Sequence, residues 1–126
     1  MTKTITGVLV DAERAHVERA TIPATLDSYY EHLDCTTIDI VSRTIGGKRF
    51  DIICDDEALL RDNPILSALD SERFPMLYGN LFVCKSKNGE LVSLTDREVS
   101  HVLRNAGKLY VNAYFKPIAV IAHVDY

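Results

Sequence analysis

Four carboxylates flank a short apolar run in the middle of the chain and could bind a divalent cation or move protons. They are Asp51, Asp55, Asp56 and Glu57. Because hard cations prefer several carboxylate oxygens, these acids support one hypothesis, a metal-dependent or nucleotide-processing enzyme. Consecutive side chains at a strand end point in different directions, however, and no D-x-D-x-D-G calcium loop is present. The alternative is structural: a strand ends here, Asp55 or Asp56 caps a helix, and Glu57 lies in its first turn.

The cysteines and histidines indicate no further chemistry. Cys35, Cys54 and Cys84 are widely spaced and contain no C-x-x-C pair, so neither a disulfide framework nor a zinc knuckle is predicted. Cys54 ends the apolar run "DIIC", which predicts a buried, unreactive thiol. The four histidines show no H-x-x-x-H or H-E-x-x-H spacing, and His32 with Cys35 offers only two potential ligands. We therefore expect no catalytic residue and no cofactor.

Positive charge gathers around a double glycine. Arg43, Lys48 and Arg49 flank Gly46-Gly47 and would lie together at the tip of a hairpin. A glycine-rich phosphate loop normally leads into a helix, whereas this one leads into a strand. These residues are either solvated tip charges or a means of holding an acidic protein, a nucleotide or a nucleic-acid phosphate.

Tyrosines offer a second candidate binding surface. The chain has six tyrosines and no tryptophan, and Tyr110, Asn112 and Tyr114 would share one face of a C-terminal strand. Tyrosine is favoured in binding surfaces because it combines a large apolar area with a polar hydroxyl. It is equally common at strand positions, so a role in covering the sheet remains the alternative.

The composition predicts one globular domain over residues 1–126. Hydrophobic residues make up 47% of the chain, charged residues 25%, and the net charge is -4. Such a charge argues against a nonspecific nucleic-acid binder, which would have a high pI. Neither a signal peptide nor an apolar run of membrane-spanning length is visible, so we expect a cytoplasmic protein.

The strongest structural prediction is a β-hairpin centred on Gly46-Gly47. A type I′ turn requires positive φ at both central residues, which two glycines supply. The turn fixes the pairing, with Ile45 opposite Lys48 and Ile40 opposite Ile53. Both faces of this hairpin are apolar in the middle, which predicts a central position with cover on both sides.

The remaining pattern predicts an α+β fold with a mainly antiparallel sheet, built from β-hairpins with two main helices packed on it. The N-terminal part is expected to form a hairpin over 5–22 and then a helix capped by Thr25, whose apolar face consists of Leu26, Tyr29, Tyr30 and Leu33. An irregular connection over 57–80 with one or two helical turns follows the central hairpin, and a strand and its return flank Asn88-Gly89. A second helix starts at Thr95, with Glu98 in a capping box and Gly107 at its end, and the chain finishes in strands broken near Lys116-Pro117.

The quoted segments "IDIVSRTIGGKRFDIICDDEALL", "GNLFVC" and "SLTDREV" resemble the family catalogued as domain of unknown function 3846. The resemblance covers nearly the whole chain, and its one departure is Ala58, where many relatives carry glycine. It implies a protein of gut bacteria and of their plasmids, conjugative elements and phages, but no particular activity. It therefore implies an accessory protein of a mobile element.

Three hypotheses follow. The leading one is a non-catalytic interaction protein that binds a protein or nucleotide partner through the residues Arg43, Lys48, Arg49, Tyr110, Asn112 and Tyr114. The second is the enzyme hypothesis based on the four carboxylates, in which Asp55, Asp56 and Glu57 would be the metal ligands. The third is a nucleic-acid-associated accessory or anti-defence factor that uses the basic hairpin tip.

Overall fold

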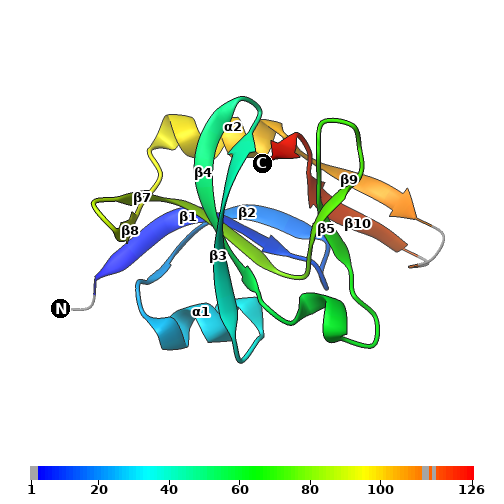
Figure 1. Ribbon diagram of the computed structural model, residues 1–126, viewed down its shortest axis with the longest axis horizontal. Coiled ribbons are helices and arrows are strands. Elements are labelled where there is room, and N and C mark those ends of the chain that lie inside the picture. Colours follow the sequence, from blue (N-terminus) through cyan, green and yellow to red (C-terminus); the bar gives the residue numbers. More distant parts are fainter. Residues whose placement is uncertain (1–2, 112–113, 115) are drawn as a thin grey trace.

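A computed structural model of the protein describes residues 3–111, 114 and 116–126 (Figure 1). It is an α+β fold with a mostly antiparallel sheet, as the sequence predicts. The strands are β1 (Thr4–Asp11), β2 (His16–Pro23), β3 (Ile38–Ile45), β4 (Lys48–Asp55), β5 (Leu66–Leu69), β6 (Pro75–Tyr78), β7 (Leu81–Lys87), β8 (Glu90–Val92), β9 (Ala106–Val111), β10 (Lys116–Ile121) and β11 (Val124–Asp125). The helices are α1 (Leu26–Leu33), the 3-10 helix η1 (Ala58–Leu60) and α2 (Asp96–Arg104).

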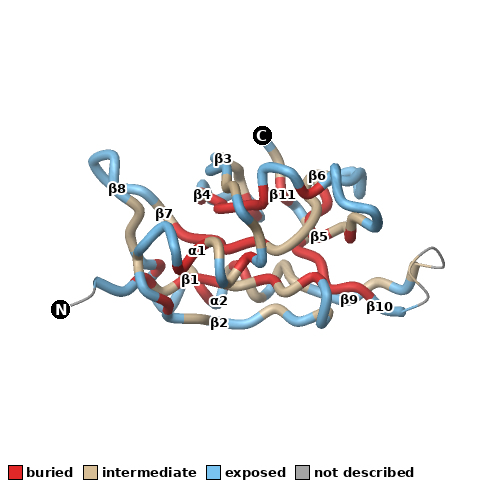
Figure 2. The backbone as a smooth tube through the Cα atoms, turned by 90° about the horizontal axis from the view of Figure 1, so that it is seen from below, coloured by how far each residue is buried: buried red, intermediate tan, exposed pale blue. Residues whose placement is uncertain are grey.

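The strands form two sheets that enclose most of the core. The larger sheet has the order β11-β3-β4-β7-β1-β2, with β8 paired to β7, and the smaller has the order β6-β5-β10-β9. One face of the larger sheet packs against α2 and the smaller sheet, around Phe50, Val83 and Val102. The other face packs against α1, where Phe82 and Leu33 meet. The buried segments accordingly run through the middle of the molecule (Figure 2).

The β3–β4 hairpin has the predicted register, but the prediction that it is covered on both sides is wrong for β3. Ile45 pairs with Lys48 and Ile40 with Ile53, and both turn glycines have positive φ. β4 lies between β3 and β7, and its apolar side chains are buried on both faces. β3 has only the two-residue β11 on its outer side, so Ile40 remains 46% exposed.

Both main helices begin where the sequence predicts. Thr25 and Thr95 are the N-caps, and the capping box of Thr95 with Glu98 is complete. Two details were predicted wrongly. Leu26, in the first turn of α1, is 53% exposed and does not join the buried residues of the helix. Gly107 does not end α2, because the helix stops at Arg104 with Asn105 as its C-cap and the chain enters β9 directly.

The connection over 57–80 is more regular than predicted. It contains the single helical turn η1, but it also contributes β5 and β6 to the smaller sheet. β5 is parallel to β10, so its pairing depends on a strand from the far end of the chain. The C-terminal segment forms the strands β9, β10 and β11, and β10 begins at Lys116, so the predicted break near Lys116-Pro117 is confirmed.

Candidate binding surface at the hairpin tip

The tip of the β3–β4 hairpin is docked onto the last turns of α2. His101 Nε2 donates a hydrogen bond to the Ile45 carbonyl at 2.7 Å, and its ring stacks on Phe50 with centroids 6.0 Å apart. Gly46 has φ +54°, and a Cβ built there would lie 2.8 Å from Asn105 Nδ2. The first glycine is therefore needed for the close approach of the helix as well as for the turn. This docking fixes the position of the tip relative to α2.

Two of the three basic tip residues hold the C-terminal strand. Arg49 donates hydrogen bonds to Ser42 Oγ, Thr44 Oγ1 and the main-chain oxygen of Tyr126. The Arg43 guanidinium lies 4.5 Å from the centre of the Tyr126 ring, a cation–π contact. Arg43 and Arg49, two of the predicted binding residues, therefore both contact Tyr126 beside β3.

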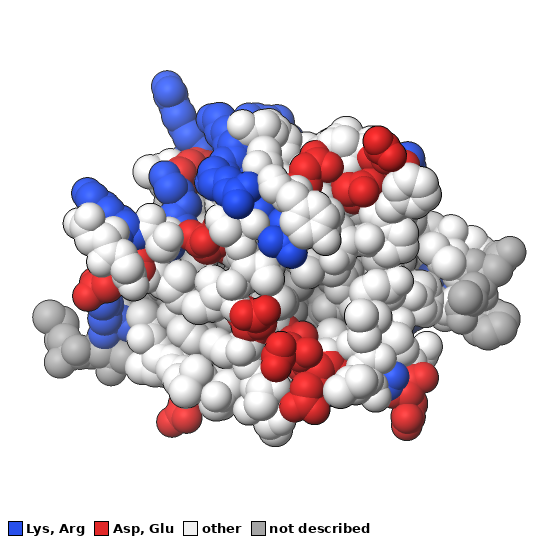
Figure 3. All heavy atoms as spheres, in the orientation of Figure 1, with Lys and Arg blue, Asp and Glu red and all other residues white. Residues whose placement is uncertain are grey.

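Lys48 is exposed and faces a hollow shared with α2. The hollow has a volume of about 410 Å³, and its remaining lining residues are Asp96, Arg97, Ser100 and Arg104. We call Lys48, Arg97, Ser100 and Arg104 the tip–helix surface. Figure 3 shows Lys and Arg gathered over this end of the molecule.

The helical repeat explains why α2 presents these residues together. Arg97 and Arg104 are two turns apart on one face, at roughly 10 Å along the axis. Val99 and Val102 occupy the opposite face and are buried in the core. Asp96 also lines the hollow, but its carboxylate is 2.7 Å from the Arg19 guanidinium of β2. The positive charge of the surface is thus left largely uncompensated.

Sequence reasoning missed Arg97, Ser100 and Arg104. Their spacing on the solvent face of a well-capped helix was visible, but nothing local indicated that the hairpin tip lies beside them. His101 and Ile45 are 56 residues apart in the sequence. The signal that could have helped is the double glycine, since a glycine in a tip can mark a close approach by another element.

The tyrosine surface is not assembled as predicted. Tyr114 donates from its hydroxyl to the Pro64 carbonyl and accepts from Leu66 N–H, so it anchors the segment before β5. Tyr110 is 68% exposed on β9, which as described ends at Val111. Tyr110 and Tyr114 therefore do not share a strand face, and the third predicted member, Asn112, lies outside the described residues.

At the opposite end of the hairpin, Asp55 is a structural anchor. Its side chain is 4% exposed, and it accepts hydrogen bonds from Glu57 N–H and from Arg61 Nε at 2.8 Å. The hydrogen bond that Arg61 donates to Asp55 raises the pKa of Arg61. The predicted strand exit is thus confirmed, but Glu57 is the N-cap of η1 and makes no side-chain capping bond.

The four carboxylates do not converge. Asp51 and Asp55 are four residues apart on β4, which separates them by roughly 13 Å. Asp56 and Glu57 are exposed, and Glu57 accepts a hydrogen bond from the Thr37 hydroxyl. Within residues 3–111, 114 and 116–126, no three His, Cys, Asp or Glu side chains are placed to hold a metal ion. The enzyme alternative, which needs these acids in one site, therefore has no such grouping among the described residues.

The buried thiols are poor nucleophiles. Burial raises the pKa of Cys54 to about 11 and that of Cys84 to about 12, so both remain protonated at neutral pH.

Near the tip, burial alone would raise the pKa of Glu98, but hydrogen bonds from Lys85 and Thr95 outweigh it and lower the pKa. Glu98 therefore stays ionised and continues to cap α2.

These features define a small α+β protein in which exposed basic residues of a hairpin tip and of a helix line one hollow. A model of the family described as "Domain of unknown function (DUF3846)" matches residues 5–107, and the chain belongs to this family. A search of the curated proteins and a search of the solved structures found no match. None of the described helices is long and apolar enough to span a membrane.

Proposed function

We propose that this protein is a non-catalytic binding protein whose tip–helix surface docks a partner with an anionic surface. The observation that supports the proposal is the convergence of Lys48, Arg97 and Arg104 from two separate segments around one hollow. In a chain with a net charge of -4, this positive region is local. A local field of this kind attracts an acidic partner and orients it during the encounter.

The rigidity of the surface also supports a binding role. The hydrogen bond from His101 to the Ile45 carbonyl and the close approach at Gly46 hold the tip against α2. Because the cations are already positioned, the partner would not have to order the backbone that carries them. Only the exposed side chains themselves would lose freedom on binding.

The family resemblance supplies the biological setting of the proposal. Similar proteins on plasmids, conjugative elements and phages support a role as an accessory protein of a mobile element. We place this role in the cytoplasm, where an anionic partner of the host or of the element would be accessible. The partner would be a protein or a nucleotide-containing ligand, as long as it presents negative charge.

Titration with poly-glutamate, followed through the backbone amide resonances, tests the proposal. The largest shifts are expected at Lys48, Ser100 and Arg104. The triple variant Lys48→Gln, Arg97→Gln, Arg104→Gln should lose binding by at least about tenfold, since about 0.5–1 kcal/mol per exposed charge accumulates over three sites. Shifts confined to another face would contradict the proposal.

A matched control removes the same charge elsewhere. Lys3→Gln, Arg14→Gln, Lys87→Gln also takes away three positive charges, all at exposed positions outside the hollow. This control should bind poly-glutamate like the unaltered protein. An equal loss in both triple variants would mean that net charge alone, and not the tip–helix surface, governs binding.

A further inference from the structure

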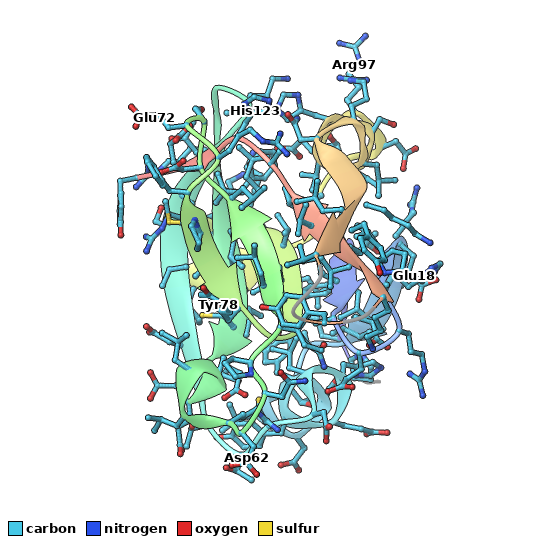
Figure 4. The ribbon with its side chains drawn as sticks, turned by 90° about the vertical axis from the view of Figure 1, so that its right-hand side faces the viewer. Glu18, Asp62, Glu72, Tyr78, Arg97 and His123 are labelled. Carbon is cyan, nitrogen blue, oxygen red and sulfur yellow. The ribbon has the colours of Figure 1, made fainter. Side chains whose placement is uncertain are left out.

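The outer edge of β3 lacks a neighbouring strand over most of its length. Among the described residues, β11 pairs only with Thr44 and Ile45, and no strand pairs with the outer edge of Ile38–Ser42. We call Ile38–Ser42 the free edge. Figure 4 shows the blue-green strands of the hairpin at one margin of the molecule, on the opposite side from Glu18 of β2. The free edge is therefore open to another chain.

The register of the hairpin decides which main-chain groups of the free edge point outward. Ile45 and Lys48 flank a two-residue turn, so they form a hydrogen-bonded pair, and every second residue back along β3 likewise bonds to β4. Ile38, Ile40 and Ser42 occupy the intervening positions, so their N–H and C=O groups face away from β4. Such a row of outward main-chain groups is a template for a further strand.

Two charged side chains cover part of this row in the single chain. Asp39 Oδ1 accepts a hydrogen bond from the Ile40 N–H at 2.9 Å. Arg43 donates a hydrogen bond to the Ser42 carbonyl, also at 2.9 Å. Asp39 and Arg43 lie on the same face of β3, because side chains two or four residues apart share a face. An acid near one end of the edge and a base near the other make the edge complementary to a second copy of itself.

We propose that the free edges of two copies of this chain pair antiparallel and join their larger sheets into one. The two-fold axis passes between the two Ile40 residues, and Ile38 of each copy lies opposite Ser42 of the other. Each Asp39 then lies diagonally across from Arg43 of the second copy, at roughly 7–8 Å between Cα atoms, which the long arginine side chain spans. In a two-fold pairing this contact occurs twice.

The neighbouring registers are each excluded by one contact. A shift by one residue sets outward-facing groups against inward-facing ones, so the hydrogen-bond ladder cannot form. A larger shift in one direction places Ile38 of the second copy opposite Thr44, where Asp125 already pairs. A larger shift in the other direction sets the two Asp39 carboxylates directly opposite each other, and like charges there are destabilising.

Ile40 supplies the apolar contact at the centre of the pairing. Its side chain is 46% exposed in the single chain. Residues that form a hydrogen-bonded pair have Cα atoms about 5.5 Å apart, so the two Ile40 side chains cover each other. An extended peptide from another protein could use the same main-chain groups, but the acid and base spaced on one edge specify a second copy. Because the paired segment is short, we expect a weak dimer that dissociates on dilution.

The dimer does not depend on the tip–helix surface, none of whose residues belongs to the free edge. If both proposals hold, one dimer carries two tip–helix surfaces. Two linked surfaces bind a long polyanion more tightly than one, because the second contact forms within the same complex. The dimer would therefore strengthen the proposed binding role without being required for it.

Sedimentation velocity over a series of protein concentrations tests the pairing. Asp39→Lys and Arg43→Glu should each weaken the dimer at least about tenfold, because each sets like charges together at two symmetry-related contacts. The double variant Asp39→Lys, Arg43→Glu restores opposite charges and should bring the affinity back to within about threefold of the unaltered protein. The controls Asp62→Lys and Lys87→Glu make the same charge changes at exposed positions outside β3 and should leave the affinity unchanged.

Hydrogen exchange locates the pairing on the chain. The amides of Ile38, Ile40 and Ser42 should exchange more slowly as the protein concentration rises, because they gain acceptors in the second copy. The Val41 amide already faces β4 and should show no such dependence. Ile40→Lys should remove both the dimer and the added protection, and a thermal melt checks that this variant is folded.

The outcomes distinguish the dimer from its alternatives. Tighter association of Asp39→Ala would show that Asp39 shields the edge from other strands, whereas its pairing with Arg43 predicts weaker association. A charge swap that fails to restore the dimer, or a dimer that survives Ile40→Lys, would overturn the inference. A chain that stays monomeric at every concentration yet binds poly-glutamate would overturn the dimer and leave the proposed function standing.

Discussion

The two ends of the β3–β4 hairpin carry opposite charges and share one feature. At the base, Asp55 is buried and fastens the chain through Arg61. At the tip, Arg49 fastens the C-terminal strand through Tyr126. In both places a residue from a charged cluster in the sequence serves as a structural anchor. The two ends differ in which side chains of other elements lie beside the remaining exposed charges of the hairpin.

At the tip, exposed charges of a second element join those of the hairpin. Lys48 shares a hollow with Arg97 and Arg104 of α2. The hollow beside Asp56 at the base is instead completed largely by apolar side chains from η1 and β6. In Figure 3, basic side chains gather over the tip and acidic ones over the base, with a further acidic group beside the tip. Convergence of separate segments therefore indicates a site better than charge density along the sequence.

The largest effect should come from the buried anchor at the base. Asp55→Ala removes two hydrogen bonds and leaves the Glu57 N–H without its acceptor, so the free energy of unfolding should fall by about 2–3 kcal/mol. Asp56→Ala, at an exposed neighbour, should change it by less than about 0.5 kcal/mol. Urea unfolding of both variants measures the difference. Equal effects would mean that Asp55 is not the anchor.

The second comparison concerns the two turn glycines. Gly46→Ala introduces a Cβ at positive φ, 2.8 Å from Asn105 Nδ2, and should cost about 2 kcal/mol. Gly47 also has positive φ, but nothing lies within 4 Å of its Cβ position, so Gly47→Ala should cost about 1 kcal/mol. The difference in thermal stability between the two variants measures the contribution of the close approach between Gly46 and α2. An equal cost would show that the docking of the tip is loose.

Alkaline pH should weaken the fold through Cys54, near the base of the hairpin. Burial raises its pKa from 9.0 to about 11, so the folded protein retains the proton after the unfolded chain has lost it. The resulting stability is complete below pH 9 and falls by about 1 kcal/mol by pH 10. Cys54→Ala should flatten the measured dependence of unfolding free energy on pH. An unchanged slope in this variant would show that the Cys54 thiol does not cause the loss of stability at alkaline pH.

The smallest effects should distinguish the arginine anchor from the exposed lysine. Arg49→Ala loses its bond to the Tyr126 main-chain oxygen, so amide exchange in β11 should accelerate about fivefold, which corresponds to about 1 kcal/mol. Lys48→Ala should leave the exchange rates nearly unchanged and should change the free energy of unfolding by less than about 0.5 kcal/mol. Hydrogen exchange of Val124 and Asp125 reports this difference. Faster exchange in the lysine variant alone would reverse the assigned roles.

Local rules were sufficient to predict much of the fold. The two glycines fixed the register of the β3–β4 hairpin, and Thr95 with Glu98 fixed the start of α2. The partial exposure of β3 could not be predicted, because it depends on which strand lies outside it. Ile40 is 46% exposed, and β11 pairs with Thr44 and Ile45 at the other end of β3.

The candidate site was predicted only in part, for the same reason. Lys48 was among the predicted residues, but Arg97 and Arg104 come from a helix that reaches the tip through tertiary packing. The contact between Arg49 and Tyr126 was not predicted, because the two residues are 77 positions apart in the sequence. Both errors concern contacts between distant segments, which no local pattern encodes.

The most direct test of the account compares the two ends of the hairpin in one binding measurement. The affinity for poly-glutamate at low salt is measured for the unaltered protein, for Lys48→Gln, Arg97→Gln, Arg104→Gln, and for Asp56→Asn, Glu57→Gln. We predict a loss of affinity of at least about tenfold for the tip variant and no loss for the base variant. An unchanged affinity in the tip variant would contradict the central claim, that the charges converging at the tip form the binding surface.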